Sequence, residues 1–326
     1  MAGIKEVAEK AGVSISTVSN VLNNKSNVGK ETREKVLRIC TELSYKSNSF
    51  SRMLKTGKSN TILFNFSDFD RSFYLRIING VSDYANDNNY DLIICTDKSC
   101  EKYMNETITA GSIVLDRRMK DEVLNRVAGE DYPVIVLDRV LDNPYIKSVI
   151  VNNYDPMYEM VQGLIHRGYR KFGFIGGHEE TADHKERYGA FIDALDANKI
   201  AFQHKNYFTG NYREKSGYNV AKIMMLSKDF PDCLVCANDN MAIGAMKAFR
   251  ENGIRIPQDI AVTGFDNCDL AEAMELTTVS IPNYERGYIA AKYLIEHIRG
   301  EKNAEVFKID AKIIYRGSVG EKSTAF

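Results

Sequence analysis

Residues 4–23, IKEVAEKAGVSISTVSNVLN, decide the fold of the N-terminal region. Apolar residues recur at helical spacing from Ile4 to Ala11, and Gly12 then predicts the end of a first helix. Ser14 is a favoured N-cap for a second helix, whose buried face would consist of Val18, Val21 and Leu22. Two short helices separated by a glycine-containing turn have the spacing of a helix-turn-helix unit.

A third amphipathic helix is predicted over residues 31–43, after Gly29, with an inward face of Val36, Leu37, Ile39, Cys40 and Leu43. The outer side of the second helix carries mostly short hydroxyl and amide side chains, which approach phosphates and base edges closely. Those outer positions are Ile15, Ser16, Thr17, Ser19 and Asn20. Many unrelated three-helix domains share this pattern, so the pattern by itself leaves their functions open.

Charge is distributed unevenly along the 326 residues, whose formal net charge is −1. Residues 1–60 hold eleven Lys and Arg residues, five Glu and no Asp, a charge of +6, so the remainder carries −7. A basic head on a larger acidic body indicates a module that binds a polyanion. Charge alone would fit a solvated basic face equally well.

The composition is that of an ordinary globular protein, with 44% apolar and 27% charged residues in a length that suits two or three domains. No apolar run approaches the roughly 18–20 residues that span a bilayer, and the N-terminus lacks a signal-peptide pattern. We therefore expect a cytoplasmic protein with no membrane partner.

Six cysteines are too few for a disulfide scaffold, and we expect them to be reduced in the cytoplasm. Cys233 and Cys236 have CxxC spacing, which could indicate a redox pair or half of a zinc site. No second CxxC pair exists, and the Leu-Val filling favours a buried strand.

From Thr61 onward, short apolar runs alternate with helical patterns, which predicts parallel sheets covered by helices on both faces. The expected fold class is α/β, with a small all-helical head and a body of two doubly wound subdomains. Ligands bind at the carboxyl ends of such strands, here in a cleft between two facing sheets. The predicted strands include residues 62–64, 92–95, 112–115, 134–137, 172–175, 233–236 and 260–262.

Polar residues follow three of these runs, in 136–139 (VLDR), 237–240 (ANDN) and 264–267 (GFDN). Each Asp or Asn could be a helix N-cap, the commoner role. Together they suggest a polyol site, because carboxylates accept hydrogen bonds from vicinal hydroxyls and Arg donates to their oxygens.

The sequence contains no recognisable catalytic constellation. Residues 173–177, GFIGG, fit neither GxGxxG nor GxxxxGK(S/T), and the five histidines form no HExxH pair. A GxSxG nucleophile elbow is absent. His184 is interpreted as a solvated loop residue, although its place near Arg187 leaves a ligand contact open. We expect no catalytic residue, no metal and no cofactor.

Residues 7–23 strongly resemble the N-terminal signature of lactose-repressor-type (LacI/GalR) bacterial transcription regulators, and residues 32–36 and 43–45 also resemble that family. The strand-end motifs resemble, in order, its effector domain, which is similar to periplasmic sugar-binding proteins. The resemblance thus covers essentially the whole chain. It implies a ligand-responsive regulator of transcription, usually a repressor, here of carbohydrate-metabolism genes.

In this family the second helix lies in the DNA major groove, so the resemblance assigns base reading to Ile15, Ser16 and Asn20. The third base-reading position is very often Arg, which pairs with guanine, whereas Asn prefers adenine. We therefore expect an operator that departs from the family's usual base opposite Asn20. The other residues that the resemblance places on DNA are Ser14, Thr17, Ser19, Asn23 and Thr32.

Residues 47–60 form the predicted hinge, and Asn48 could cap one or two helical turns there. So short a helix is unstable alone. The resemblance implies that it forms in the minor groove beside its counterpart from a second subunit, where Leu54 wedges between base pairs and Asn48, Ser51 and Arg52 lie nearby. Ser47 and Ser51 replace a usual Pro and Ala, so we expect a weakened hinge helix.

The same resemblance implies an effector cleft with six lining residues, among them an aromatic that stacks on a sugar face, Tyr212. The loop 71–74 and Ile281 depart from the family pattern, so one wall should be less polar than usual. The expected effector is a sugar or sugar phosphate. The six residues are Phe73, Asp138, Arg187, Tyr212, Asn238 and Asp266.

We predict a DNA-binding domain over 1–46, the hinge over 47–60, and an effector-binding and dimerisation domain over 61–326. Within the latter, the chain should cross between halves near 150, 280 and 310, giving an N-subdomain of about 61–150 plus 281–309 and a C-subdomain of about 151–280 plus 310–326. No heptad tail follows residue 318, so we expect a homodimer on a palindromic operator. A phosphocarrier co-repressor, used by some relatives, stays open.

Two other function classes fit parts of the sequence less well than a regulator does. A sugar-binding or transport protein would explain the body but neither the basic head nor the missing signal peptide. An α/β enzyme would lack the residues for its chemistry. A steep fall of DNA affinity with salt separates the regulator from both.

Overall fold

The structure is a computed structural model that describes residues 3–22, 25, 27–45, 59–67, 69, 73–96, 99–105, 108–227, 230–301 and 304–322. Its contacts divide the chain into two compact units, Met1–Ser59 and Asn60–Phe326. The first holds the helical head, and the second holds the α/β body.

The head consists of three helices, α1 (Ile4–Ala11), α2 (Ile15–Leu22) and α3 (Lys30–Glu42). Gly12 ends α1 in the left-handed conformation, with φ at 64°, as its place in the sequence predicted. Ser14 accepts a hydrogen bond from the backbone N–H of Thr17 at 3.1 Å, so it caps the start of α2. The three helices share a core of Val7, Ala8, Ala11, Val18, Val21, Val36, Ile39 and Cys40.

One of the predicted inward residues of α3 does not face this core. Leu37 is 47% exposed, whereas Val36 next to it is fully buried. Helical spacing is compatible with an apolar face that includes both residues. In the packed head, however, only Val36 belongs to the core shared by the three helices. The prediction for Leu37 was therefore wrong.

The first half of the body is a parallel six-stranded sheet in the order β11-β5-β4-β3-β1-β2. Apolar runs that are buried on both faces explain why these strands lack an alternating pattern. The strands are β1 (Thr61–Phe66), β2 (Asp91–Cys95), β3 (Ser112–Leu115), β4 (Val134–Val136), β5 (Ile146–Val151) and β11 (Val306–Ile309). The accompanying helices are α5 (Phe73–Asp87), α6 (Ser99–Asn105), α7 (Asp121–Val127) and α13 (Asn283–Ile298).

The second half is another six-stranded sheet, in the order β12-β10-β9-β8-β6-β7, in which only β12 is antiparallel to its neighbour. Its strands are β6 (Phe172–Gly176), β7 (Tyr207–Thr209), β8 (Cys233–Cys236), β9 (Ala261–Asp266), β10 (Thr277–Ser280) and β12 (Lys312–Ile314). Its helices are α8 (Tyr154–His166), α9 (Ala182–Ala197), the 3-10 turn η1 (His204–Asn206), α10 (Glu214–Met224), α11 (Asp239–Glu251) and α12 (Asp269–Ala273).

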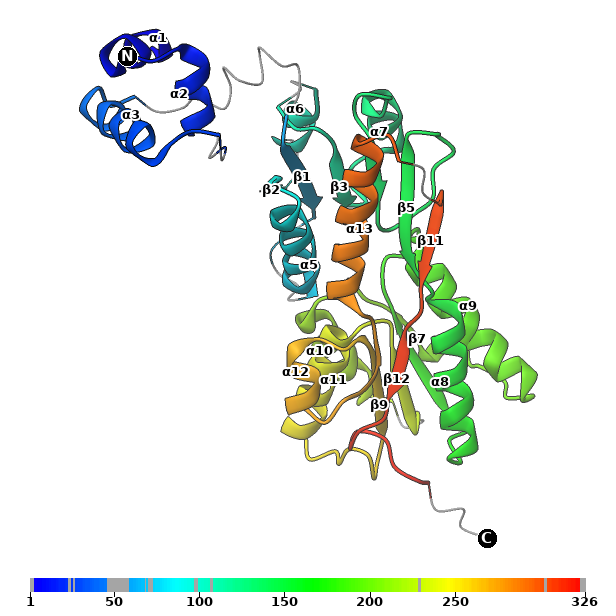
Figure 1. Cartoon of the computed structure of the whole chain (residues 1–326). Coiled ribbons are helices and arrows are strands. Elements are labelled where there is room, and N and C mark those ends of the chain that lie inside the picture. The colour runs from blue at the N-terminus through cyan, green and yellow to red at the C-terminus, as the bar shows by residue number, and fades with distance from the viewer. Residues whose placement is uncertain are drawn as a thin grey trace. The chain divides into compact units, whose positions relative to one another are not determined.

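The chain passes between the two sheets three times. It leaves the first sheet after β5, returns between β10 and α13, and leaves again between β11 and β12. In Figure 1 the last passage is the red segment that runs from one half to the other. Each half is therefore built from separate stretches of sequence, and three connections flank the space between them.

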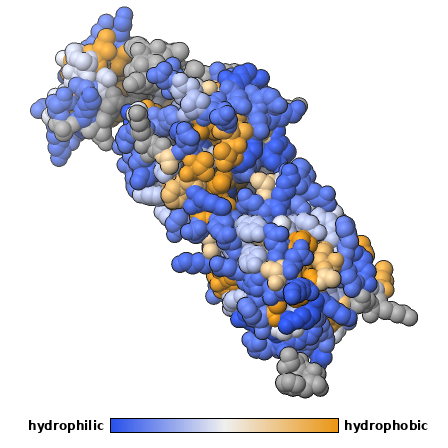
Figure 2. Space-filling view, turned by 90° about the vertical axis from the view of Figure 1, so that its right-hand side faces the viewer, coloured by the Kyte–Doolittle hydropathy of each residue, from blue (hydrophilic) through white to orange (hydrophobic). Residues whose placement is uncertain are grey.

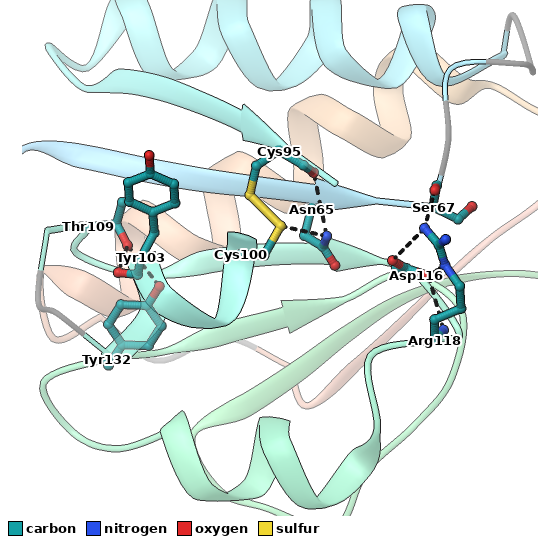
Figure 3. The surroundings of a disulfide bond; sticks show 9 residues. All are labelled: Asn65, Ser67, Cys95, Cys100, Tyr103, Thr109, Asp116, Arg118 and Tyr132. Carbon is teal, nitrogen blue, oxygen red and sulfur yellow. Dashed lines mark hydrogen bonds and ion pairs between the residues drawn. A yellow bond between two sulfur atoms is a disulfide. The ribbon is translucent and has the colours of Figure 1, made fainter. Parts of the chain in front are cut away.

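Two cysteines of the first half form a disulfide, Cys95 at the end of β2 and Cys100 in α6 (Figure 3). Asn65 on β1 donates to Cys100 Sγ at 2.8 Å. The expectation that all six cysteines are reduced is therefore wrong for this pair, because the fold places the end of β2 beside α6, which sequence spacing alone does not show. Cys233 and Cys236 are free and fully buried on β8, as the apolar filling between them predicted.

The surface drawn in Figure 2 is mostly hydrophilic, with hydrophobic residues gathered in a few patches. No helix among the described residues is long and apolar enough to cross a membrane.

Candidate functional site

A cavity of about 890 Å³ lies between the two halves of the body. It is lined from the carboxyl ends of strands in both sheets, by residues that follow β1, β3, β4 and β5 on one side and β6, β7, β8 and β9 on the other. In open α/β sheets, ligands bind outside the carboxyl ends of the parallel strands. All six residues that the sequence placed in a cleft line this cavity, namely Phe73, Asp138, Arg187, Tyr212, Asn238 and Asp266.

Arg187, on the second turn of α9, is held rigidly in the second half. It is 5% exposed. Its Nε donates to Asn153 Oδ1 at 2.9 Å, its Nη1 donates to the carbonyl oxygen of Ala237 at 2.6 Å, and its Nη2 lies 3.6 Å from Asp266 Oδ1. The guanidinium carbon also lies 3.8 Å from the centre of the Phe265 ring. Protein groups therefore hold this cation on several sides, and it also lines the cavity.

Asn238 has two structural tasks besides lining the cavity. Its Oδ1 accepts from the backbone N–H of Met241 at 3.1 Å, which caps α11, and its Nδ2 donates to the carbonyl oxygen of Tyr212 at 3.0 Å. Asn238 is therefore both the helix N-cap that the sequence suggested and a residue of the cleft wall. The same side chain fixes the loop that carries Tyr212.

Two of the cleft residues have backbone conformations that most side chains avoid. Tyr212 has φ at 64° and Asp266 has φ at 108°. Such conformations cost free energy and cluster at ligand sites. The residue directly after β6, Gly177, has to be a glycine here, because a Cβ there would lie 1.9 Å from the ring carbon Cζ of Tyr212.

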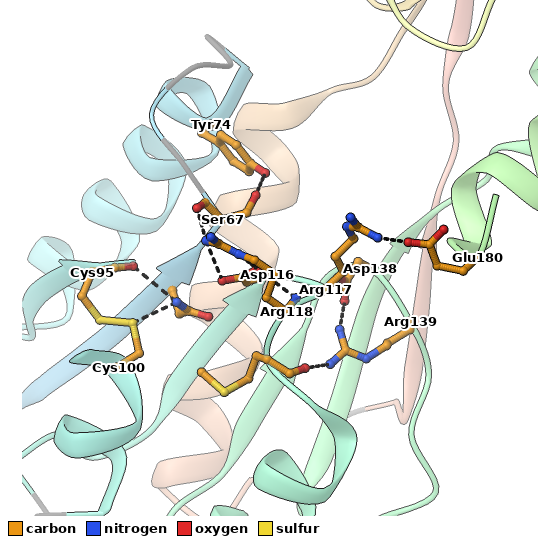
Figure 4. A network of polar contacts seen from close by, with 12 residues as sticks. Ser67, Tyr74, Cys95, Cys100, Asp116, Arg117, Arg118, Asp138, Arg139 and Glu180 are labelled. Carbon is orange, nitrogen blue, oxygen red and sulfur yellow. Dashed lines mark hydrogen bonds and ion pairs between the residues drawn. A yellow bond between two sulfur atoms is a disulfide. The ribbon is translucent and has the colours of Figure 1, made fainter. Parts of the chain in front are cut away.

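Asp138 follows β4 and accepts a hydrogen bond from Arg139 Nη1 at 2.8 Å (Figure 4). Arg139 Nε also donates to Asp121 Oδ1 at 2.7 Å. Burial raises the pKa of the Asp138 carboxyl, and the adjacent Arg139 opposes that rise. Asp138 is therefore a carboxylate whose partner holds it in place at the cavity wall.

Two ion pairs link the halves across the cleft. Arg117, after β3, pairs with Glu180, which precedes α9, as Figure 4 shows. Arg76 on α5 donates to Asp269 on α12 at 2.6 Å. The halves are therefore joined by side-chain contacts as well as by the three connecting segments.

Two residues that the sequence singled out lie in the protein core instead. Asp239, from the ANDN run, is 1% exposed, and it accepts from Thr278 Oγ1 at 2.5 Å and from the backbone N–H of Cys268 at 2.7 Å. Burial raises the pKa of its carboxyl to about 8, with a further contribution from Asp266. His184 is 4% exposed in α9, so its interpretation as a solvated loop residue was wrong. It packs among Phe174, Tyr188 and Tyr207 and does not line the cavity.

Several cavity residues were missed by the sequence. Asn153, Asp183, Asn283 and Arg286 all line it and are buried or half-buried. Asn283 and Arg286 follow Ile281 on the wall expected to be less polar, so that expectation overlooked two polar residues. The sequence does show polar residues soon after an apolar run, at residues 281–286. They were overlooked because Ile281, which differs from the family pattern, suggested an apolar wall.

In the head, the outer face of α2 carries the predicted base-reading side chains. Ile15 is 42% exposed, and Ser16 is exposed beside Ser14, whose Oγ lies 2.6 Å from Ser16 Oγ. Thr17, Ser19, Asn20 and Thr32 are half-buried. Other predicted DNA contacts lie outside the described residues; these are Asn23, Asn48, Ser51, Arg52 and Leu54.

Comparisons with known proteins find relatives that match nearly the whole chain. Residues 3–48 match the bacterial regulatory proteins of the lacI family, and residues 161–319 match the periplasmic binding protein-like domain. The chain is 30% identical to the HTH-type transcriptional regulator RegA of Clostridium saccharobutylicum, over 97% of this chain and 98% of that protein. It is 32% identical to the HTH-type transcriptional repressor PurR of Vibrio atlanticus (strain LGP32), over 98% and 99%. This chain belongs to the lacI family.

The fold of this lacI-family protein is also that of solved relatives. A lac repressor dimer bound to operator and the anti-inducer ONPF superposes with a TM-score of 0.83 at 24% identity, covering 97% of this chain and 98% of that one. The family and its named repressors establish a DNA-binding, ligand-responsive transcriptional repressor, and its relatives are regulators rather than enzymes.

Proposed function

We propose that this protein is a repressor of carbohydrate-metabolism genes, which binds a palindromic operator as a homodimer and is controlled by a sugar-like effector in the cleft. The observation that carries the proposal is the cavity at the strand ends, with all six expected residues on its walls. Two solved proteins of similar fold hold sugars: the transcriptional regulator CelR in a complex with cellobiose, and a LacI family transcriptional regulator from Enterococcus faecium with bound ribose.

The cleft has the chemistry that a polyol needs. Asp138 and Asp266 offer carboxylate oxygens that accept hydrogen bonds from hydroxyls, and Asn238 lines the same space. Phe73 and Tyr212 add aromatic rings whose faces suit the C–H face of a sugar ring. A pocket that combines aromatic rings with a few fixed polar groups is typical of small-molecule sites.

We infer that the effector acts by changing how the two halves meet. Residues on both sides of the cavity contact one ligand, so binding favours one relative position of the halves by its difference in affinity for the two states. The halves carry the hinge, proposed at 47–60, and the DNA-binding domain, proposed at 1–46. The position of the halves then supports or melts the hinge helix, with Leu54 as its minor-groove wedge.

The homodimer is supported by apolar side chains that the body leaves exposed on neighbouring helices. Leu75 on α5 is 59% exposed and Leu270 on α12 is 57% exposed. The Arg76–Asp269 pair joins these two helices, and Tyr284 of α13, 40% exposed, donates to Asp83 of α5 at 2.9 Å. A second copy of this chain would cover these side chains, and a two-fold dimer reads a palindrome.

Fluorescence anisotropy tests the proposal directly. The full chain is titrated onto DNA from its own and adjacent promoters at fixed salt, with and without a panel of sugars and sugar phosphates. We expect tight operator binding that one compound loosens or tightens. Tight binding that no compound alters would favour a phosphocarrier co-repressor instead, and binding at only the nonspecific level would contradict the operator assignment.

The cleft assignment has its own test in the same assay. Asp266→Ala should leave operator affinity intact and abolish the ligand response, because Asp266 lines the cavity and not the DNA-binding unit. Loss of DNA binding in a folded Asp266→Ala variant would contradict the assignment.

A further inference from the structure

The cleft walls hold polar atoms that the protein leaves without partners. Among the described residues, seven buried side-chain N or O atoms have no hydrogen-bond partner, and four of them belong to residues that line the cavity. Two of the four, Asn283 Oδ1 and Arg286 Nε, lie together on the first turn of α13. The others are Glu186 Oε2 and Tyr212 OH.

Arg286 is a buried cation without a paired anion. Its residue is 7% exposed, and its Nη2 donates to the carbonyl oxygen of Leu137. Burial lowers the pKa of its guanidinium to about 10, so the group is still charged at neutral pH. A buried charge is costly unless it is paired and hydrogen-bonded.

The acidic groups nearest to this cation are already engaged. Asp138 and Asp266 both act on Arg286 electrostatically. However, Asp138 is bonded to Arg139 at 2.8 Å, and Asp266 lies 3.6 Å from Arg187. Among the described residues no carboxylate lies within ion-pair distance of Arg286, so Asp138 and Asp266 offset its positive charge only from a longer distance.

Arg187 shows what a fully satisfied arginine in the same cavity looks like. It has a carboxylate, an amide oxygen, a backbone carbonyl and an aromatic face as partners. Arg286 has one backbone carbonyl and an unpaired Nε. The difference indicates that Arg286 is completed by something that enters the cavity.

We propose that Arg286 and Asn283 form an anion-binding subsite, and that the effector is an acidic polyol that carries a carboxylate or a phosphate. This rests on the proposed function of the cleft. In a guanidinium, the Nε–H and one Nη2–H point to the same side and match two oxygens of one anionic group. In Arg286 the Nε has no partner, and Nη2 donates one hydrogen bond, to Leu137. Asn283 Oδ1, 3% exposed as a residue, accepts from a neighbouring hydroxyl.

The position of the subsite also explains how an acidic effector would act on both halves. Arg286 and Asn283 begin α13, directly after the chain returns to the first half at residues 281–282. Arg187 and Asn238 lie in the second half. An effector held by its anionic end at α13 and by its hydroxyls in the second half ties the two together.

The test uses a probe that does not require the effector to be known. Binding of inorganic phosphate to the full chain is measured by calorimetry and by its rise in Tm, against sodium chloride at equal ionic strength. Wild type is compared with Arg286→Gln and with Arg299→Gln, a control at the other end of α13 that does not line the cavity. We expect phosphate binding in wild type and Arg299→Gln, and an affinity at least tenfold lower in Arg286→Gln.

Paired ligands then identify the anionic group. Glucuronate is compared with glucose, and ribose 5-phosphate with ribose, so that a carboxylate and a phosphate are tested separately. A preference for an acidic member that Arg286→Gln removes supports the subsite and names the group. Equal phosphate binding by wild type and Arg286→Gln, or no phosphate binding by wild type, overturns it.

Stability gives a second readout that needs no ligand. Arg286→Met replaces a buried charge that has no ion-pair partner with an apolar side chain of similar length, so the ligand-free variant should have a higher Tm than wild type. A folded Arg286→Met protein with a lower Tm would mean that the cation has a structural partner and would overturn the proposal. Operator binding, measured separately, shows whether the regulator assignment itself holds, so the two failures are distinguishable.

Discussion

At the scale of single residues, the same polar side chain serves both stability and the cleft. Asn238 caps α11 and anchors the Tyr212 loop, while Asp239, its neighbour, turns into the core. Asn238 has an extended backbone as the N-cap, whereas Asp239 is the first residue of α11, and only Asn238 lines the cavity. Residue type suggested a polyol site here, and side-chain direction decided which residue lines it.

Asp239 makes the stability of the body depend on pH. Its carboxyl has a pKa of about 8 when folded, well above the value of about 3.9 in an unfolded chain. Between these values the folded state holds a proton that the unfolded state has lost, so the free energy of unfolding falls as pH rises from about 4 to about 8, by at most about 1.4 kcal/mol per pH unit. Urea unfolding at a series of pH values measures this slope.

The matched variants are Asp239→Asn and, at an exposed site, Asp131→Asn. Asp239→Asn loses the titrating group, so it should flatten the slope even though it lowers stability by removing an acceptor for Cys268. Asp131→Asn should keep the wild-type slope. An unchanged slope in Asp239→Asn would show that another group is responsible.

Asn20 carries the prediction about the operator. An asparagine pairs in bidentate fashion with adenine, so selection from a random half-site library should enrich adenine opposite residue 20. Asn20→Ala should lose that preference, at a cost of about 1–3 kcal/mol in discrimination. Enrichment of guanine that disappears in Asn20→Ala would refute the assignment.

At the scale of elements, each half has one pair of helices that touch through glycines. A Cβ on Gly244 of α11 would lie 2.0 Å from the carbonyl oxygen of Glu214, and one on Gly217 of α10 would lie 1.9 Å from that of Met241. In the other half, a Cβ on Gly80 would lie 2.0 Å from the carbonyl oxygen of Tyr284. The α10–α11 and α5–α13 contacts thus require residues without side chains.

Gly244→Ala should therefore destabilise the protein, by about 1–3 kcal/mol or more, because the helices must move apart. Gly189→Ala in α9 is the control, since a Cβ there meets nothing within 4 Å. That change should stabilise the protein by about 0.5–1 kcal/mol through helix propensity. Chemical denaturation compares the two, and similar effects of both substitutions would contradict the close-contact argument.

At the scale of the whole body, the two cross-cleft ion pairs favour contact between the halves. Their side chains are largely exposed, at 43% and 66% for Arg117 and Glu180 and 49% and 57% for Arg76 and Asp269. Exposed pairs contribute roughly 0.2–1 kcal/mol each and weaken with salt. Together they favour the closed cleft by only a small free energy, so the halves can still separate.

The combined Glu180→Gln and Asp269→Asn variant should open the ligand-free body more often. Energy transfer between dyes placed on the two halves should then report a longer mean distance, and added salt should shift wild type the same way. Lys292→Gln, which breaks a pair within α13, is the control. Equal distances in wild type and the double variant would show that the connecting segments alone set the position of the halves.

The sequence by itself determined the elements and the family. Helix spacing, caps and glycine stops in residues 4–45 specify local structure, which depends on neighbours a few residues apart. Apolar runs indicated seven of the strands for the same reason, but they did not single out β5, β7, β10, β11 or β12. The dense motif of residues 7–23 specified the class of regulator. Strand-end polarity brought Asp138, Asn238 and Asp266 to attention, and the family resemblance added Phe73, Arg187 and Tyr212; all six line the cavity.

Only the tertiary structure decided what depends on distant parts of the chain. The exposure of Leu37, the burial of His184 and the Cys95–Cys100 pair follow from packing between elements that no local pattern encodes. The clearest case is Arg286, whose sequence position says nothing of its missing anion. Its lack of a partner becomes visible only when Asp138 and Asp266, more than a hundred residues apart, are seen to be engaged with other arginines, because the free energy of a buried charge depends on everything packed around it.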